Sequence, residues 1–372
     1  MKYLFILGRN IDLSIAEIES FLKKENNPII KKKLNQNGLL ISVERPLEFE
    51  TINRLGGTLS IGNIIVEGKG KDLFNKMEKI MIYTGESNKL SYAVWNFSSL
   101  WDDCTDYLKE RFKSEKLKTN YKGLTGSIES QDGEIEQKPS SKVLDEEYFI
   151  FEEEGEQYFG KIIQRCNYQE IEKRDMEKPI RRESLAIAPR LAKILINLSG
   201  LKRGDKLFDP FCGVGGIIQE ALLQDIDVIG SDIDGAAIQG ARQNMKWFGF
   251  SEDRFQLIHF DSTKVNIPEV DAIATEPDLG DTLKKIPTKD KAKNTLKNFE
   301  ILMVKVINNA KDKVKGKIVF TSPYIRTGKK RLSCDIDNIC KRTGYRLSRD
   351  PIPEFRDRQI VGRMIYILTP SK

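Results

Sequence analysis

The spacing of hydrophobic residues alternates between strand-like and helix-like patterns along the chain. In the first 70 residues it predicts a small α+β domain. Apolar runs at residues 3–8 and 38–43 are typical of strands. Between them, apolar side chains recur every three or four positions from Leu13 to Leu22, which predicts a helix. Residues 52–68 contain a pair of glycines that marks a turn, followed by a further apolar strand.

Residues 71–165 repeat this mixed pattern more loosely, and we expect them to form a second α+β domain. Helices are predicted near 71–82 and 101–113, and strands over "SYAVWNF", "YFIFEE" and "QYFGKIIQR". The polar stretch 125–141 predicts a loop or a strand-and-loop segment, because it is rich in glycine, serine and acidic residues.

Residues 166–184 are highly charged and almost free of apolar side chains, which is typical of a linker. From residue 185 to residue 372, an amphipathic helix is followed by regular alternation of strands and helices. Such alternation predicts an α/β fold with a doubly wound, largely parallel sheet. The last strand, "RMIYILTP", is expected to enter as an antiparallel strand at the edge.

Composition excludes several classes of protein. The chain is 39% hydrophobic and 31% charged, and none of its apolar runs is long enough to span a membrane. The N-terminus alternates like a strand and does not resemble a signal peptide. Five dispersed cysteines and one histidine argue against a disulfide framework, a metal site and a histidine-based catalytic triad. We therefore expect a cytoplasmic protein without a metal.

The balance of charge is mildly basic and suits a polyanionic partner. The formal net charge is +6, and basic clusters occur in every third of the chain, including residues 31–33, 113–123, 173–182 and 328–331. Each cluster by itself is more often a solvated surface. Together they fit a long nucleic acid that several domains contact.

The stretch "LFDPFCGVGGIIQEAL", residues 207–222, carries the strongest chemical signal. A strand ends at Asp209 and Pro210, and Gly213 and Gly215 open a helix, so that the backbone can approach a ligand closely. An acid at this turn would repel a phosphate, but it suits the cationic amino-acid end of S-adenosylmethionine.

The next two predicted strands also end in acids. Asp232, followed by Ile233, is placed to accept hydrogen bonds from ribose hydroxyls, and Asp261, followed by Ser262, from the adenine amine. One such acid alone is often a helix N-cap. Three acids that end three successive strands favour a cofactor site.

Glu276 ends the fourth predicted strand, within "IATEPDLG". An acceptor here, with the backbone carbonyl that follows it, could hold an exocyclic amine while the amine attacks a methyl group. Most of the rate would come from alignment, because methyl transfer from a sulfonium needs little acid–base help.

These motifs resemble the THUMP-domain tRNA guanosine N2-methyltransferases, which modify guanosine at position ten of tRNA. The resemblance rests on "DPFCGVGGIIQEAL", "VIGSDID", "ARQNMKWFG" and "TEP", on the junction "RDMEKPIRRESLAIAPRLAKILINLSG", and on the N-terminal "YLFILGRNIDLSIAEIESFL" with "LGGTLSIGNI". It implies a ferredoxin-like domain at 1–70, a THUMP-like RNA-binding domain at 71–165, a linker at 166–184 and a Rossmann-like methyltransferase domain at 185–372.

The family pattern also implies S-adenosylmethionine as cofactor, tRNA as partner and, in some relatives, a small activating subunit. It assigns catalysis to Glu276, Pro277 and Asp278, but this chain has Asp278 and Leu279 where the family carries an aromatic ring. Tyr324 from "FTSPYIRTG" could supply a ring instead. We expect tRNA to contact Lys116, Lys118, Lys122, Arg174, Arg181 and Arg182.

Two other functions fit the same residues. Because Asp278 replaces the ring that would stack on a flipped base, the chain could be a tRNA-binding protein that has lost catalysis. It could also be an amine methyltransferase that acts on another RNA or DNA base. The resemblance of the N-terminal half to THUMP proteins argues against a DNA substrate.

Overall fold

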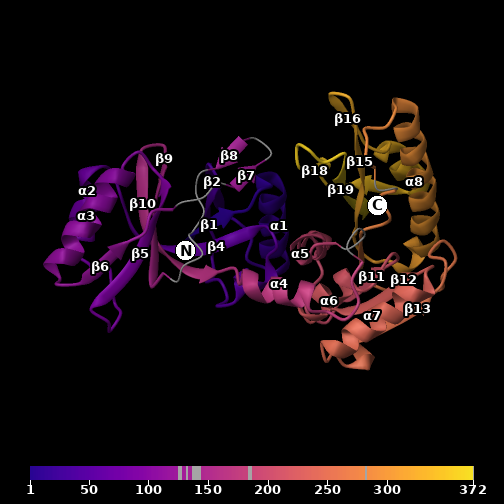
Figure 1. The fold of residues 1–372 in the computed structure, drawn as a ribbon, viewed down its shortest axis with the longest axis horizontal. Helices are drawn as coiled ribbons and strands as arrows, with labels where there is room; N and C mark the ends of the chain where they lie inside the picture. The colour runs from indigo at the N-terminus through magenta and orange to yellow at the C-terminus, as the bar shows by residue number, and fades with distance from the viewer. Residues whose placement is uncertain (125–127, 131–132, 136–143, 183–186, 281–282, 372) are drawn as a thin grey trace. The chain divides into compact units, whose positions relative to one another are not determined.

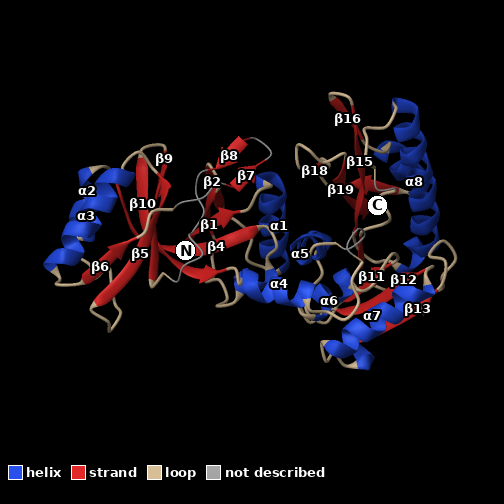
Figure 2. Cartoon of the chain, in the orientation of Figure 1, coloured by secondary structure: helices blue, strands red, loops and turns tan. Residues whose placement is uncertain are grey.

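The computed structural model describes residues 1–124, 128–130, 133–135, 144–182, 187–280 and 283–371. They form two compact units (Figure 1). The first comprises Met1–Ile15, Asn27–Asn53 and Gly57–Cys166. The second comprises Ala16–Asn26, Arg54–Gly56 and Asn167–Lys372. Figure 2 shows that both combine strands and helices.

The first unit contains an eight-stranded sheet with the order β2-β3-β1-β4-β10-β9-β5-β6. Its strands are β1 Lys2–Leu7, β2 Lys31–Asn35, β3 Gly38–Ser42, β4 Thr58–Gly68, β5 Lys89–Phe97, β6 Lys118–Tyr121, β9 Glu146–Glu153 and β10 Glu156–Arg165. The central strand β4 pairs with β1 on one side and β10 on the other, so this sheet runs across the expected boundary at residue 70.

Alternation along β5 builds a hydrophobic core on each face of this sheet. Tyr92 and Val94 pack with residues of α2 (Lys71–Met77) and α3 (Trp101–Ser114), while Trp95 and Phe97 belong to the opposite cluster. Within the predicted polar stretch, β7 (Ile128–Ser130) and β8 (Gly133–Ile135) form a hairpin. Residues 125–127, 131–132 and 136–143 lie outside the described residues.

The second unit is built on a nine-stranded sheet with the order β13-β12-β11-β14-β15-β19-β17, to which β16 and β18 add at the edge. Its strands are β11 Lys206–Asp209, β12 Asp227–Asp232, β13 Phe255–His259, β14 Ala272–Thr275, β15 Ile318–Thr327, β16 Lys330–Leu332, β17 Tyr345–Leu347, β18 Ile352–Glu354 and β19 Val361–Pro370. The strands from β13 to β15 are parallel, and β19 runs antiparallel to β15. The predicted largely parallel sheet and the antiparallel orientation of the last strand are therefore confirmed. Its predicted position at the edge is wrong, because β19 lies between β15 and β17.

Helices precede and connect these strands. They are α4 Tyr168–Met176, α5 Pro189–Ser199, α6 Gly216–Leu222, α7 Gly235–Trp247, α8 Lys289–Ala310 and α9 Ile336–Thr343. Helix α5 starts with Pro189 in its first turn and ends at Gly200 in the left-handed conformation, the usual asymmetry of helix ends. Helix α4 lies inside the stretch 166–184 that the sequence presents as a linker.

The end of helix α1 (Ile11–Lys24) belongs to the second unit and packs against α5. The buried amide of Asn197 donates to Glu17 Oε1 at 2.8 Å and to the Arg54 carbonyl at 2.7 Å, and it accepts from Lys24 Nζ at 2.9 Å. A Cβ atom on Gly56 would lie 2.0 Å from the Arg190 carbonyl oxygen, so only glycine fits this approach.

Candidate active site

The parallel strands of the second unit end around a cavity of about 420 Å³. Its lining includes Asp232 and Ile233 after β12, Asp261 after β13, and Glu276 after β14. Ligands of doubly wound sheets bind at this carboxyl edge, because the loops there are free to shape a crevice. Four of the strand ends singled out in the sequence therefore come together, since Asp209 ends the neighbouring β11.

The glycine turn after β11 brings the backbone close to Asp232. Gly213 and Gly215 both have positive φ, and the Gly213 amide donates to Asp232 Oδ2 at 2.9 Å. The other oxygen of Asp232 accepts from the Asp234 amide at 2.9 Å. A Cβ atom on Gly213 would meet nothing within 4 Å, so this turn leaves open space beside the carboxylate.

Asp209 is buried rather than exposed in the cavity. Its side chain is 1% exposed and accepts from Thr275 Oγ1 at 2.6 Å and from the Phe211 amide at 3.2 Å. Burial raises the pKa of Asp209 to about 7. It lines a smaller cavity of about 40 Å³ that shares Phe211, Gly213 and Glu276 with the larger one.

The loop after β13 has one exposed acid and one structural hydroxyl. Asp261 Oδ1 accepts from the amide and the hydroxyl of Thr263 at 2.9 and 2.8 Å, and these hydrogen bonds lower the pKa of Asp261. Ser262 is buried, and its hydroxyl bonds to the Pro210 carbonyl and to Ser231, so it ties two strand ends together. Ile233 is 72% exposed and Phe260 is 50% exposed, which leaves apolar surface beside the acids.

Glu276 is held by an arginine that the sequence reading did not single out. Arg363 on β19 donates Nε to Glu276 Oε2 at 2.7 Å and a terminal nitrogen to Oε1 at 2.8 Å, and Thr321 Oγ1 donates to Oε2 at 3.3 Å. Arg363 also lines the cavity. The only sequence signal was a cation inside the apolar strand "VGRMIYIL".

The residues after Glu276 complete this wall of the cavity. Pro277 is buried, and Asp278 is exposed, with its Oδ1 accepting from the Gly280 amide at 2.9 Å. Tyr324 packs against Phe355 with ring centroids 5.6 Å apart, and within the described part of the chain it is not one of the residues that line this cavity.

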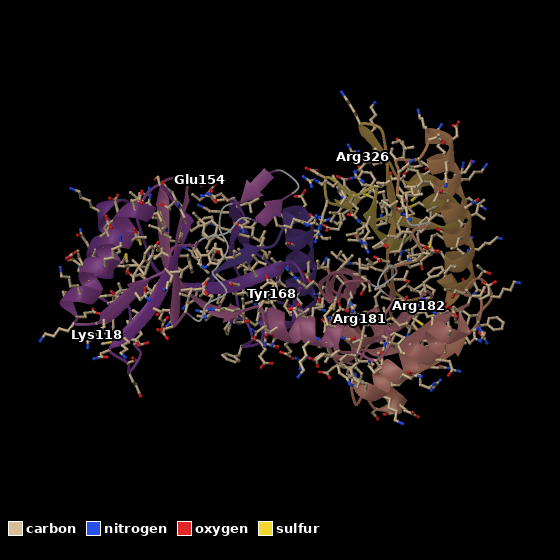
Figure 3. The ribbon with its side chains drawn as sticks, viewed as in Figure 1. Lys118, Glu154, Tyr168, Arg181, Arg182 and Arg326 are labelled. Carbon is tan, nitrogen blue, oxygen red and sulfur yellow. The ribbon has the colours of Figure 1, made fainter. Side chains whose placement is uncertain are left out.

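The six expected RNA contacts fall in both units. Figure 3 labels three of them, Lys118, Arg181 and Arg182. Lys116 and Lys118 are exposed and Lys122 is half-buried in the first unit. Arg182 pairs with Asp234 at 2.6 Å and lines the cavity. Arg174 contacts the fully buried carboxylate of Glu220 at 3.3 Å, which gives it a structural role, and Arg181 is half-buried.

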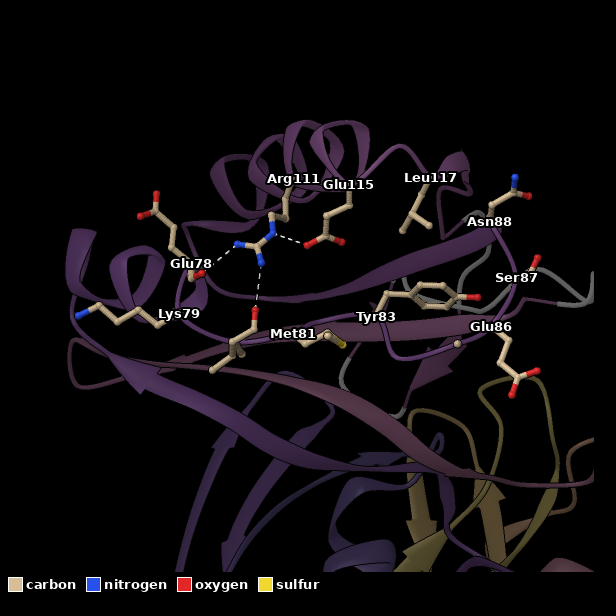
Figure 4. Close-up of a pocket in the computed structure, with 12 residues that line it drawn as sticks. Glu78, Lys79, Met81, Tyr83, Glu86, Ser87, Asn88, Arg111, Glu115 and Leu117 are labelled. Carbon is tan, nitrogen blue, oxygen red and sulfur yellow. Dashed lines mark hydrogen bonds and ion pairs between the residues drawn. The ribbon is translucent and has the colours of Figure 1, made fainter.

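The first unit has a cavity of its own, of about 570 Å³ (Figure 4). Arg111 donates to the carbonyls of Glu78 and Ile80 at 3.1 Å each and pairs with Glu115. Because its guanidinium is occupied in this way and Glu86 adds another acid, the cavity does not suit a phosphate. Across the described residues, no helix is suited by length and composition to cross a bilayer, and no group of side chains has the makeup of a metal site.

The parallel sheet and its carboxyl-edge cavity define the second unit as a Rossmann-like α/β domain. Residues 179–309 match the family described as UPF0020: RMKL-like, methyltransferase domain. TrmN from Thermus thermophilus has a similar fold, with a TM-score of 0.54 and 15% identity over the whole of both chains.

Curated relatives carry more specific names. The tRNA (guanine(10)-N2)-dimethyltransferase of Methanothermobacter thermautotrophicus is 43% identical over 96 residues, which is 26% of this chain and 28% of that protein. The enzyme of the same name from Pyrococcus abyssi is 25% identical over 75% of this chain and 78% of its own length. The chain therefore matches less than a third of the length of the Methanothermobacter enzyme.

Proposed function

We propose that this chain transfers a methyl group from S-adenosylmethionine to the exocyclic N2 amine of a guanosine in tRNA, at position ten as in the named relatives. The observation that carries the proposal is the cavity at the carboxyl edge, where Asp232, Asp261 and Glu276 meet. The names of the curated relatives add the substrate.

The cavity has the features that the cofactor requires. Asp232 and Asp261 offer carboxylate oxygens to hydroxyl and amine donors, and the exposed side chain of Ile233 offers apolar surface to a purine ring. Asp209 would hold the ammonium end next to the open turn at Gly213. When bound, the cofactor supplies a methyl group activated by a sulfonium.

Glu276, Pro277 and Asp278 would hold the target amine. Arg363 fixes both carboxylate oxygens of Glu276. Because Oε2 also accepts from Thr321, Oε1 is the oxygen that retains a second lone pair for an N–H donor. The Pro277 carbonyl and the exposed Asp278 carboxylate offer further acceptors at the same wall. These groups orient the amine, and the pull of Glu276 on its hydrogen stabilises the positive charge that develops on nitrogen.

A tRNA-binding protein without catalytic activity remains the second candidate. Two observations favour it: Arg363 and Thr321 already occupy the oxygens of Glu276, and Asp278 and Leu279 leave no aromatic ring on this loop. Loss of a stacking ring costs roughly 1–3 kcal/mol in single-stranded nucleic-acid binding. Such a loss would slow the reaction and need not abolish it.

The test is transfer of tritiated methyl groups to tRNA that lacks this modification, with the product nucleoside identified by mass spectrometry. We expect N2-methylguanosine from the wild type and a rate lower by on the order of 10²-fold for Glu276→Gln. Arg363→Lys removes the bidentate contact with Glu276, and we expect it to lower the rate of methyl transfer roughly 10-fold. Arg346→Lys, an exposed change on the neighbouring strand β17, is the matched control.

The outcomes separate the two candidates. Methylguanosine from wild type and its loss in Glu276→Gln would support the enzyme. A protein that binds both cofactor and tRNA but transfers no methyl group, alone or with a small activating subunit, would support the binding protein.

A further inference from the structure

Strand β15 continues well beyond the parallel sheet to which it belongs. It pairs with β14 only from Ile318 to Phe320, and it then runs on to Thr327 paired with β19 and, at its end, with β16. At about 3.4 Å per residue, Thr321–Thr327 extends roughly 24 Å past Phe320. Figure 1 shows β16 at this far end of β15.

The base of this hairpin touches the candidate active site. Thr321 on β15 and Arg363 on β19 both donate to Glu276, and Arg363 lies opposite Pro323 in the register of the two strands. Because β15 leaves the sheet at its carboxyl edge, the hairpin rises on the same edge as the cavity.

Arg331 of β16 locks the hairpin to the loop that precedes β19. Its guanidinium donates to the carbonyls of Tyr324, Arg356, Gln359 and Ile360 at distances from 2.6 to 3.4 Å. It also lies 4.2 Å from the ring centroid of Phe355. A cation held by four carbonyls fixes both segments, so the hairpin is a preorganised arm.

Arg326 adds to this lock, since it donates to the carbonyls of Gly328 and Asp357 at 3.2 and 3.1 Å. With Arg326 and Arg331 committed to the backbone, the cations that face solvent are Lys329, Lys330, Arg356 and Arg358, all exposed. The acidic residues of the same segments are Asp357 and the half-buried Glu354. A rigid surface with this excess of positive charge attracts a polyanion.

We propose that the β15–β16 hairpin and the loop 355–358, together called the basic arm, bind the phosphate backbone of the RNA whose target base enters the cavity. This inference rests on the proposed function and adds an RNA contact in the second unit to those expected from the sequence. Lysine and arginine contacts to phosphates position a nucleic acid without reading its sequence. The basic arm would therefore set the register of the tRNA at the active site.

The test is the double change Lys329→Glu/Lys330→Glu in the full chain, with tRNA binding measured over a range of salt. We expect the Kd for tRNA to rise at least 10-fold at about 0.1 M salt, and the slope of log Kd against log salt to fall by about 2 as two phosphate contacts are lost. The KM for tRNA should rise similarly, while kcat at saturating tRNA and the Kd for S-adenosylmethionine stay unchanged.

The matched control is Lys311→Glu/Lys313→Glu. Both lysines are exposed in the short helix η3 (Lys311–Lys313), which lies where the parallel strands begin. It makes the same change in net charge at the opposite edge of the sheet, and it should weaken tRNA binding by no more than about 2-fold, a general charge effect.

Three outcomes would overturn the inference: normal tRNA binding by the basic-arm variant, an equal loss in the control, or tighter binding of polyglutamate than of tRNA at the basic arm. Methylation that continues with normal KM in the variant would leave the proposed function standing. Wild-type protein that neither binds nor methylates tRNA would remove both.

Discussion

Asp209 and Asp232 end adjacent strands, yet their surroundings give them different electrostatic properties. Asp232 lines the open cavity and accepts two backbone amides. Asp209 is buried, and Asp232 and Glu276 lie close enough to add to its raised pKa. A buried carboxylate of this kind is costly without a cation nearby, which makes it a natural partner for an ammonium group.

The raised pKa gives cofactor binding a defined pH dependence. Below pH 7 Asp209 is mostly protonated, and above pH 7 it is ionised and attracts a cation. We expect the affinity for S-adenosylmethionine to rise by about 10-fold from pH 6 to pH 8. Calorimetric titration at several pH values measures it, and Asp209→Asn should give weak, pH-independent binding.

Asp209→Asn also tests the sign of the effect on stability. Since the folded pKa lies above the ordinary value of 3.8, the unfolded chain loses its proton first as pH rises, and the unliganded fold loses stability from about pH 4 through pH 7. The asparagine variant should therefore unfold at a higher temperature than wild type at pH 8 in the absence of cofactor. A lower midpoint would contradict the assignment.

At the scale of elements, the features that could be predicted were those whose sequence pattern lies within one strand and the turn that follows it. The glycine turn after β11 and the acids after β12, β13 and β14 could be predicted because each belongs to one strand and the turn that follows it. The bond between Arg363 and Glu276 could not, since it depends on the register of β19 against β15. The packing of the end of α1 against α5 could not be predicted either, because these contacts join distant segments of sequence.

Asn197 on α5 forms hydrogen bonds with the end of α1. Asn197→Ala would leave Glu17 Oε1, the Arg54 carbonyl and the Lys24 ammonium without this partner in a buried place. We expect a loss of about 2–4 kcal/mol in the free energy of unfolding. Denaturant titration measures it, and Asn298→Ala, an exposed change on α8, should lose less than about 0.5 kcal/mol.

At the scale of the molecule, the second unit includes two pieces of chain that precede its main segment, Asn167–Lys372. A chain of residues 167–372 would lack Ala16–Asn26 and Arg54–Gly56, which belong to that unit. We expect it to unfold roughly 5 °C or more below the matching transition of the full chain. In that shorter chain Asn197→Ala should cost little, because the partners are already gone. An equal midpoint would show that these pieces contribute no stability.

The long sequence separation of Glu276 and Arg363 has a consequence for the synthesis of the protein on the ribosome. The two residues lie 87 positions apart, and the arginine sits in the last strand. At 5–20 residues per second, translation needs about 4–17 s to travel from one to the other. During that time Arg363 has not yet been synthesised to pair with Glu276, so we expect the proposed methyl transfer to begin only after the C-terminal strand has joined the sheet.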